Sequence, residues 1–404
     1  MKIAYVCADP GVPVFGRKGC SIHVQEVIRA LRGRGAEVEL FAVRTGGEAP
    51  ADLREVRVHR LRVAPSEGDS AREQALLAAN AGWREQFEQA GPFDAWYERY
   101  SLWSCAAMEY ARECQLPALL EVNAPLIEEQ AAHRGLIDAV GAQDTARRAF
   151  RSATSLLAVS EEVGRYLEGF REAEGKVEVI ANGVNVERFA LALEQRRARA
   201  VQATGTTVGF VGTLKPWHGT DLLVEAFAGL AAREAEARLL IVGDGPERSH
   251  LEAQVASLGL ASQVHFTGSV QPEEVPGWLA AMDIAAAPYP GLDHFYFSPL
   301  KVYEYMAAGL PVVASRIGQL ENLVQDGETG CLVAPGEVAA LAEALVTLSR
   351  DPALRERLGT AARRRVEARH TWSAVAERIL QRASRIPAPA FTAGDLVLAT
   401  EGSL

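Results

Sequence analysis

The stretch FYFSPLKVYEYMAAGLPVVAS, residues 295 to 315, predicts a short helix that leads into a buried strand. Ser298 is a favourable N-cap, Pro299 a favourable first helical residue and Gly309 a left-handed stop, so we expect a helix of about three turns. The apolar run that follows, LPVVAS, is typical of a parallel strand that is covered on both faces. The stretch therefore predicts one helix and one strand of a parallel α/β sheet.

A carboxylate lies within this helix at Glu304. Glu304 lies four residues after Leu300 and three and four residues before Ala307 and Ala308, so we expect it to share their helical face and to face the sheet. A buried carboxylate needs a partner, which is either an internal arginine or, because helix N-termini in such sheets open at the ligand crevice, a bound ligand. Both interpretations stay open on this stretch alone.

The rest of the chain alternates between strand-like and helix-like segments and does so twice. The first series starts with KIAYVCA and ends with VEVIANG, and the second starts with TTVGFVGTL and ends with LPVVAS. The Arg-rich segment between them carries no strand signal. We therefore predict an α/β protein with two doubly wound, Rossmann-like domains over residues 1–186 and 205–370, a linker over 187–204, and a C-terminal helix and tail over 371–404.

Composition limits the function classes. The 404 residues are 48% hydrophobic and 23% charged, which is ordinary for a soluble globular chain, and the net charge of −10 argues against nucleic acid as a partner. Arg-rich runs at 146–151, 195–200 and 362–369 leave weak peripheral contact with a membrane open. The five cysteines show no metal-ligand spacing, the N-terminal segment does not resemble a signal peptide, and no apolar stretch reaches membrane-spanning length. We expect a cytoplasmic protein of undetermined oligomeric state.

Three glycine-bearing loops follow predicted strands. In PGVPVFGRKGCS, residues 10 to 21, Gly16 and Gly19 bracket Arg17 and Lys18, a pattern that suits either an anion or sugar site or a plain connection. In GTLKPWHGTD, residues 212 to 221, a glycine turn precedes Lys215, which is a plausible diphosphate ligand. In GDGPERS, residues 243 to 249, the third glycine of a dinucleotide fingerprint is missing, so we predict a tight turn.

Motifs of other chemistries are missing. The sequence contains no G-x-x-x-x-G-K-[ST], no G-x-S-x-G and no H-E-x-x-H, and the complete G-x-G-x-x-G of nicotinamide enzymes does not follow the first strand.

Several motifs together identify a family resemblance. GTLKPWHGTDLLVEAF, LLIVGDGPER, VHFTGSV and FSPLKVYEYMAAGLPVVAS occur in the order and spacing of glycosyltransferase family 4, and FGRKGCSIHVQEVIRALRGRGAEVELF, EVNAP and IANGVNVERF extend the resemblance over nearly the whole chain. The family implies the GT-B fold, with the C-terminal helix packing back toward the N-terminal domain. It also implies retaining transfer from a nucleoside diphosphate sugar bound in the C-terminal half to an acceptor bound in the N-terminal half.

The resemblance also implies roles for individual residues. Glu304 is the second glutamate of the E-x7-E element and is expected to hold the donor ribose, while Gly268 and Val270 would lie along the base. The donor set predicted in this way is completed by Gly212, Thr213, Tyr296, Ser298, Pro299, Leu300 and Lys301. The catalytic set is Lys215, Glu304 and His218, and the acceptor and phosphate loop consists of Gly16, Arg17, Lys18, Gly19 and Asn123.

The chain departs from the family pattern at four positions. Tyr296 stands where the first glutamate of E-x7-E belongs, and Thr213 and His218 stand where the diphosphate-binding Arg and Lys are usual. Lys215, with Lys301, is the expected replacement for these cations. Asn123 occupies the position of a sugar-contacting His.

The function expected from these features is metal-independent, retaining transfer of a hexose from a UDP- or GDP-type sugar, used as a co-substrate with no cofactor, to an unknown acceptor hydroxyl. No carboxylate pair of the hydrolase type is evident. Three alternatives stay open: a non-catalytic nucleotide or sugar binder, a nucleotide-sugar epimerase, and a nicotinamide-dependent oxidoreductase, which the missing glycine fingerprint disfavours.

Overall fold

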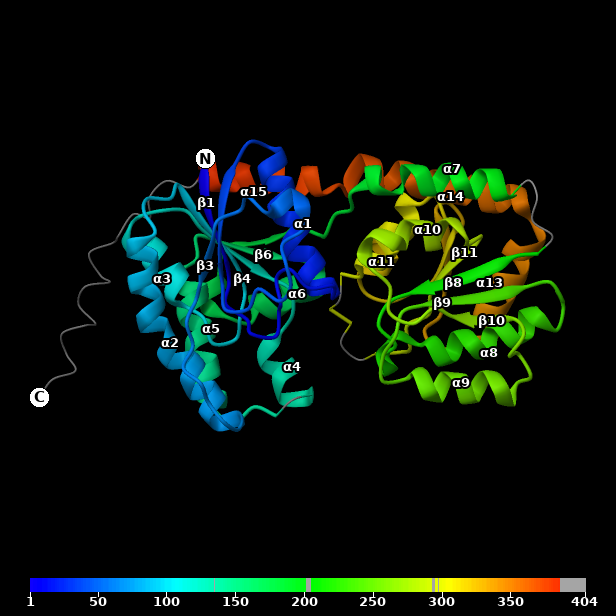
Figure 1. Ribbon diagram of the computed structural model, residues 1–404, viewed down its shortest axis with the longest axis horizontal. Coiled ribbons are helices and arrows are strands. Elements are labelled where there is room, and N and C mark those ends of the chain that lie inside the picture. The colour runs from blue at the N-terminus through cyan, green and yellow to red at the C-terminus, as the bar shows by residue number, and fades with distance from the viewer. Residues whose placement is uncertain (134, 201–204, 293–294, 297, 386–404) are drawn as a thin grey trace, which may run out of the picture.

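The computed structural model describes residues 1–133, 135–200, 205–292, 295–296 and 298–385. It consists of two lobes, each built on its own parallel sheet, with helices on both faces of each sheet (Figure 1). The GT-B prediction of two doubly wound domains is confirmed.

The N-terminal domain is built on seven strands in the order β3-β2-β1-β4-β5-β6-β7, and every neighbouring pair is parallel. The strands are β1 (Lys2–Cys7), β2 (Glu37–Ala42), β3 (Val58–Arg60), β4 (Ala95–Arg99), β5 (Ala118–Val122), β6 (Ser155–Ala158) and β7 (Val177–Val179). The first and last of them, β1 and β7, lie within the predicted segments KIAYVCA and VEVIANG. The strand order reverses between β1 and β4, which creates a crevice at their carboxyl ends.

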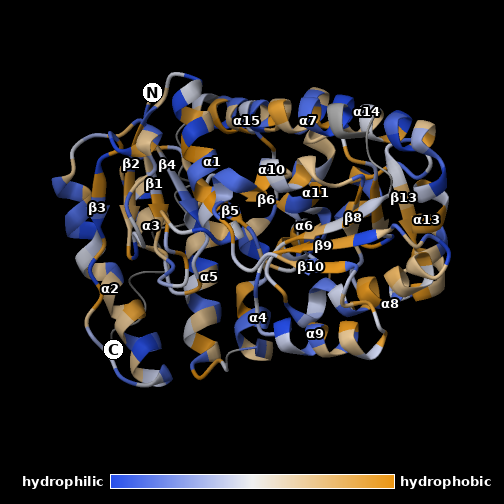
Figure 2. Ribbon diagram, turned by 45° about the vertical axis from the view of Figure 1, so that its right-hand side comes forward, coloured by the Kyte–Doolittle hydropathy of each residue, from blue (hydrophilic) through white to orange (hydrophobic). Residues whose placement is uncertain are grey.

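Helices and short 3₁₀ turns connect these strands. They are α1 (Gly19–Gly33), η1 (Ala51–Leu53), α2 (Asp69–Gln89), α3 (Ala106–Glu113), α4 (Leu126–His133), α5 (Ala139–Ser152), α6 (Glu161–Glu168) and η2 (Arg171–Ala173). Helix α2 carries both hydrophilic and hydrophobic residues along its length (Figure 2). Its buried residues include Leu76, Trp83 and Phe87, so one face of the helix covers the sheet while the other meets solvent.

The C-terminal domain repeats this arrangement with six parallel strands in the order β10-β9-β8-β11-β12-β13. The strands are β8 (Thr207–Val211), β9 (Arg238–Val242), β10 (Val264–Phe266), β11 (Ile284–Ala287), β12 (Val312–Ser315) and β13 (Gly330–Val333). The edge strand β13 was not predicted. The order reverses between β8 and β11, and ligands of open α/β sheets bind at the carboxyl ends of such a pair of strands, a region called the C-terminal crevice below.

The C-terminal domain is covered by α8 (Thr220–Ala231), α9 (Arg248–Ser257), α10 (Val275–Ala280), α11 (Leu300–Ala307), α12 (Gln319–Leu323), α13 (Val338–Arg350) and α14 (Pro352–Arg369), with 3₁₀ turns η4 (Pro216–His218) and η5 (Pro272–Glu274). The described part of the predicted linker is helical, with η3 (Val186–Phe189) followed by α7 (Ala190–Ala200). Helix α7 packs on this domain, because Ala192 is buried and Arg196 reaches Glu356 of α14 at 3.3 Å.

The chain returns to the N-terminal domain through α15 (Trp372–Arg385), as expected for the C-terminal helix. In Figure 1 this helix lies beside α1, far from the C-terminal sheet. Trp372, Val375, Ala376 and Ile379 are buried in the same apolar cluster as Ile3 of β1. Among the described helices, none has both the length and the apolar character that crossing a bilayer requires.

Candidate active site

Three glycine turns meet at the carboxyl ends of β8, β9 and β10. Gly212, Gly243 and Gly268 all have positive φ, at +151°, +135° and +73°. A Cβ atom on Gly243 would lie 2.0 Å from the carbonyl oxygen of Gly212, so a side chain cannot fit there. Gly243 and Gly268 are joined by an isolated β-bridge. The three loops thus form a close-packed floor beside the C-terminal crevice, and GDGPERS is the tight turn that its sequence predicted.

The ammonium group of Lys301 projects from the first turn of α11 into this crevice. Its Nζ lies 4.3 Å from the ring centroid of Phe210 on β8 and 5.5 Å from that of Tyr289, which follows β11. Nζ is buried and has no hydrogen-bond partner among the described residues. Burial lowers the pKa of Lys301 to about 7, and the nearby Glu304 carboxylate offsets only part of this effect. A buried cation held by two aromatic faces is a site prepared for an anion.

His218 and Lys215 lie on the same side of the crevice. The Nδ1 of His218 donates to the carbonyl oxygen of Thr213 at 2.5 Å, which leaves Nε2 as the acceptor. Burial, together with the positive charges of Lys301 and Lys215, lowers the pKa of His218 to about 3. His218 is therefore neutral near pH 7. The Lys215 Nζ lies 5.4 Å from the Trp217 ring centroid. The structure brings these predicted residues together, whereas their catalytic role stays a prediction.

The start of α11 differs from the prediction. Ser298 makes no side-chain capping bond; Pro299 occupies the N-cap position, and the helix begins at Leu300. The carbonyl of Ser298 instead accepts a hydrogen bond from Asn182 Nδ2 at 3.1 Å. The N–H of Val302 donates to the Pro299 carbonyl at 3.0 Å, whereas those of Leu300 and Lys301 have no acceptor within the helix, so this end can receive an anion. The predicted stop at Gly309 is confirmed by its φ of +70°.

The prediction that Glu304 faces the sheet is wrong. Leu300 and Glu304 lie on one stripe of α11, but the stripe borders a gap of about 10 Å³ between the domains, opposite Glu26 of α1 and Arg188 of η3. The face of α11 toward the sheet is formed by apolar residues such as Val302. Burial raises the pKa of Glu304 to about 7, and Arg188 opposes the shift. Arg188 is thus a positive charge near Glu304 at the domain boundary, and its guanidinium group lies 3.6 Å from the carboxylate of Glu26.

Tyr296, at the position of the missing glutamate, turns toward the N-terminal domain. Its hydroxyl donates to Glu129 Oε2 on α4 at 3.0 Å, and its carbonyl accepts from Ser160 Oγ at 3.0 Å. The segment before α11 is therefore attached to the opposite domain at both Tyr296 and Ser298.

A buried polar network that sequence reasoning missed supports this attachment. His23 Nδ1 accepts from Arg99, so its Nε2 donates to Asn182 Oδ1 at 2.9 Å. Glu121 lies 3.3 Å from the same nitrogen and accepts from Asn123 Nδ2 at 3.0 Å. Burial lowers the pKa of His23 to about 4, so the network contains a neutral imidazole. The residues of this network come from α1, β4 and β5, which lie far apart in the sequence. No local motif therefore indicates the network.

The remaining predicted residues lie apart from Lys301. Arg17, Lys18 and Gly19 are exposed at the start of α1, and no described contact joins them or Gly16 to the C-terminal crevice. Val270 is half-buried and packs against the apolar core of the C-terminal domain. Within the described ranges, no group of three or more His, Cys, Asp or Glu side chains could hold a metal ion.

Comparisons with protein families match both domains. Residues 17–188 match the profile described as Glycosyltransferase Family 4, and residues 205–351 match that described as Glycosyl transferases group 1.

Named relatives cover most of the chain. D-inositol 3-phosphate glycosyltransferase 2 of Catenulispora acidiphila is 30% identical over 396 residues, which span 91% of this chain and 90% of that protein. The 2-deoxystreptamine glucosyltransferase of Streptomyces kanamyceticus is 32% identical over 213 residues, 51% of this chain and 54% of that protein. Among solved structures, Anabaena HepE in complex with UDP superposes with a TM-score of 0.74 at 21% identity, covering 96% of this chain and all of that one, which shows the shared fold.

Proposed function

This chain belongs to glycosyltransferase family 4 and is a hexosyltransferase, and on that premise we propose that it transfers a hexose from a UDP- or GDP-type sugar to an acceptor hydroxyl. The transfer proceeds with retention at the anomeric carbon and without a metal ion. The observation that carries the proposal is the buried Lys301 ammonium group, which has no hydrogen-bond partner in the described part of the chain and lies where the strand order of the C-terminal sheet reverses. Ligands of open α/β sheets bind at that point.

In the proposed reaction, the main task of the protein is to stabilise a leaving diphosphate. The bond from the anomeric carbon to the phosphate oxygen breaks while the acceptor oxygen bonds to the same face of that carbon. The acceptor proton passes to the departing phosphate, so no protein base is needed. Lys301 and Lys215 neutralise the negative charge that develops on the diphosphate, and the N-terminus of α11 adds its dipole.

Other residues bind rather than react in this proposal. His218 presents Nε2 as a neutral acceptor for a donor hydroxyl. Glu304 holds the ribose, and Gly268 and Val270 line the base. HepE, which shares the fold, has been solved with UDP and with UDP-glucose, which supports a nucleotide-sugar donor. The names of relatives that act on inositol 3-phosphate and on 2-deoxystreptamine support a polyhydroxylated ring as the acceptor.

The test measures donor binding and turnover separately. We expect one nucleotide among UDP, GDP and ADP and their hexose conjugates to raise the melting temperature, and its hexose conjugate to be consumed in the presence of an acceptor and EDTA. Stabilisation by a nucleotide with no turnover of any conjugate across an acceptor panel would favour the non-catalytic binder.

Lys215→Ala sharpens the test. Because the cation acts mainly on the leaving group, we expect turnover to fall about 100-fold or more while nucleotide affinity changes less. The matched control is Arg238→Ala, which removes an exposed cation at the amino end of β9, away from the carboxyl ends of the strands. Equal turnover in Lys215→Ala and the wild type would refute the assignment.

A further inference from the structure

Helix α4 of the N-terminal domain contacts the C-terminal domain at two points. Glu129 accepts a hydrogen bond from the Tyr296 hydroxyl at 3.0 Å. One turn later, the imidazole of His133 stacks on the indole of Trp217, with ring centroids 6.0 Å apart and planes inclined by 29°. Residues four positions apart lie on the same face of a helix. One face of α4 is therefore directed at the C-terminal domain.

These two contacts fall on the two segments that follow the central strands of the C-terminal sheet. Trp217 lies in η4, between β8 and α8, and Tyr296 lies between β11 and α11. The strand order of the sheet reverses between β8 and β11, so both segments border the C-terminal crevice. Helix α4 thus joins the N-terminal domain to both borders of the crevice in which the donor is proposed to bind.

Trp217 connects His133 to Lys215. The Nζ of Lys215 lies 5.4 Å from the centroid of the Trp217 ring, within the range of a cation–π interaction. A lysine side chain is long and flexible, so it reaches one defined position only where a neighbour holds it. The position of the Lys215 ammonium group therefore depends on the orientation of the indole ring, which in turn is stacked on His133.

The backbone of the turn that carries Lys215 and Trp217 is fixed within the C-terminal domain. His218 Nδ1 donates to the Thr213 carbonyl across the turn. Gly219 closes the turn with a φ of +65°, and a Cβ atom there would lie 1.8 Å from the carbonyl oxygen of Pro288, so no other residue fits. What the N-terminal domain can determine is therefore the orientation of the Trp217 side chain and not the course of the backbone.

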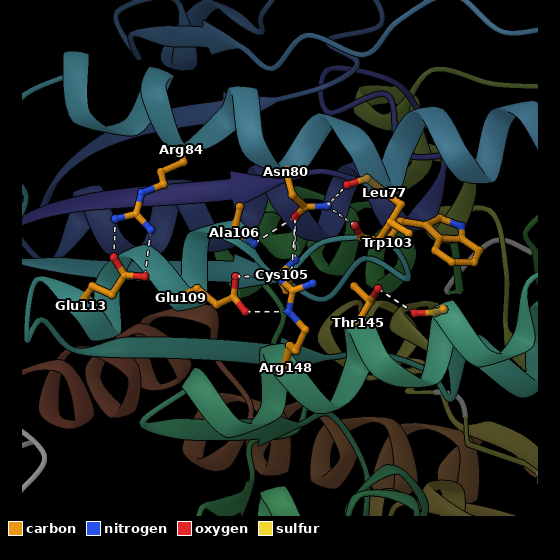
Figure 3. Close-up of polar contacts among 11 residues, drawn as sticks. Leu77, Asn80, Arg84, Trp103, Cys105, Ala106, Glu109, Glu113, Thr145 and Arg148 are labelled. Atoms are coloured by element: carbon orange, nitrogen blue, oxygen red, sulfur yellow. Dashed lines mark hydrogen bonds and ion pairs between the residues drawn. The ribbon is translucent and has the colours of Figure 1, made fainter. Parts of the chain in front are cut away.

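A cavity of about 300 Å³, called the N-terminal cavity here, adjoins α4 within its own domain. Its lining includes Gln130 of α4 and Trp103 of the loop that follows β4. Asn80 of α2 holds this loop, because it donates to the Trp103 carbonyl at 2.8 Å and accepts from the N–H groups of Cys105 and Ala106, both at 3.0 Å (Figure 3). A molecule in the N-terminal cavity would therefore contact both a rigid loop and the helix that carries His133.

We propose that His133 and Trp217 are positioning residues: in the arrangement of domains seen here, the imidazole orients the indole, and the indole holds the Lys215 ammonium group against the leaving diphosphate. This inference rests on the proposed function, because it takes Lys215 as a cation of the diphosphate site. Neither positioning residue contacts the reacting atoms. When α4 moves away from the crevice, the nucleotide still binds, but Lys215 is no longer held in place and the leaving group loses its stabilisation.

The first measurement follows Lys215 directly and needs no turnover. The lysines are trace-acetylated with N-acetoxysuccinimide, alone and with UDP, GDP or ADP, and acetylation of Lys215 is quantified by mass spectrometry against Lys2 at the start of β1. In the wild type we expect a bound nucleotide to slow acetylation of Lys215 about fivefold or more, because an ammonium group bound to phosphate is a poor nucleophile. In His133→Ala, where the replaced side chain is exposed and folding should be unaffected, we expect most of this protection to be lost while calorimetry shows nearly unchanged nucleotide affinity. Equal protection in the two proteins overturns the proposal.

The second measurement separates turnover from binding. His133→Ala should lower kcat about tenfold with little change in the KM for the donor, and His133→Phe, which keeps a ring for stacking, should restore most of the activity. In a Lys215→Ala background, His133→Ala should have no further effect, because both changes act through one ammonium group. An equal loss of kcat with and without Lys215 would show that His133 acts by another route.

A matched control is available inside the C-terminal domain. His265 of β10 and Trp278 of α10 form the same kind of stack, with centroids 6.4 Å apart and planes inclined by 28°. His265→Ala should therefore change neither the protection of Lys215 nor kcat.

The outcomes separate this inference from the proposed function. If His133→Ala loses the protection of Lys215 but the wild type consumes no donor, the proposed function fails while the positioning role stands. If a donor is consumed and His133→Ala matches the wild type in protection and in kcat, the reverse holds. If no nucleotide protects Lys215 in the wild type, the positioning role is overturned whether or not a donor is consumed.

Discussion

Lys301 is a single side chain whose charge state should report donor binding. Its pKa of about 7 is a consequence of burial, and a diphosphate beside Nζ would raise it again. Near pH 7.5 we therefore expect UDP binding to take up a proton, and we expect affinity to fall as the pH rises above 7. Calorimetry in buffers of different ionisation enthalpy measures the uptake directly.

Two variants test this assignment. Lys301→Met should abolish most of the proton uptake and weaken UDP binding about tenfold or more. Lys215→Met removes the neighbouring, half-exposed cation and should keep the uptake. Equal proton uptake in the wild type and Lys301→Met would show that another group titrates.

Glu98 should make the protein less stable as the pH rises. Burial raises the pKa of its carboxyl group from 4.5 to about 7, so the folded state holds the proton more tightly than the unfolded state. The free energy of unfolding should therefore decrease between pH 4.5 and pH 7, by up to about 3 kcal/mol from this group. In Glu98→Gln we expect the difference in stability between pH 5 and pH 8, measured by urea unfolding, to shrink by about that amount. An unchanged pH dependence would contradict the assigned pKa.

Asn80 shows how one helix determines the shape of a neighbouring loop. Asn80→Ala leaves two N–H groups of α3 and one carbonyl without their partner, so we expect a loss of about 1–3 kcal/mol of unfolding free energy. Asn80→Asp keeps the acceptor and should lose less. The control on the same helix is Gly82→Ala, where a Cβ meets no atom within 4 Å and should stabilise α2 by about 0.5–1 kcal/mol. An Asn80→Ala protein as stable as the wild type would remove the support for a rigid cavity wall.

Elements with strong local patterns were predictable from the sequence, and those that depend on tertiary partners were not. Most strands are buried apolar runs, so they were found. Strand β13 has four residues, of which two are only half-buried, and it gave no such signal. The sequence of α7 indicated an Arg-rich linker, because the contacts that hold this helix on the C-terminal domain join it to residues far along the chain. For Glu304, the prediction that it shares one face of the helix with Leu300 was correct. The sequence could not show that this face lies opposite the domain boundary and not opposite the sheet.

The candidate site shows the same division. Lys215 was predicted because it follows a glycine turn, whereas Lys301 and His218 were predicted from the family resemblance. The aromatic side chains around Lys301 come from β8 and from the end of β11, and the N-terminal cavity collects residues from four loops and helices. Contacts of this kind result from the order of strands in a sheet, which local sequence does not encode.

Hydrogen bonds between the domains, together with the packing of α15 on the N-terminal domain, hold the whole molecule in its present arrangement. Asn182 donates to Ser298 O, Ser160 to Tyr296 O, and Gln319 of α12 to Val159 O. Asn182→Ala removes one of these bonds and also the Oδ1 acceptor of His23 Nε2, which leaves only Glu121, at 3.3 Å, near that nitrogen among the described residues. We expect a more open arrangement, seen as a larger radius of gyration in X-ray scattering, and a several-fold lower kcat with nucleotide affinity nearly unchanged. Asn322→Ala, at an exposed position of α12, is the control, and equal scattering curves for the Asn182→Ala and Asn322→Ala proteins would rule out this role.

The return of α15 to the N-terminal domain also affects the order in which the protein can be completed during synthesis. The ribosome makes β1 to β7 first, yet Trp372, Val375 and Ile379, which cover Ile3 and its neighbours, are made only after the whole C-terminal domain. Domains fold as units while the chain grows. The nascent N-terminal domain must therefore expose an apolar surface until α15 emerges, and we expect it to need protection from aggregation for that interval.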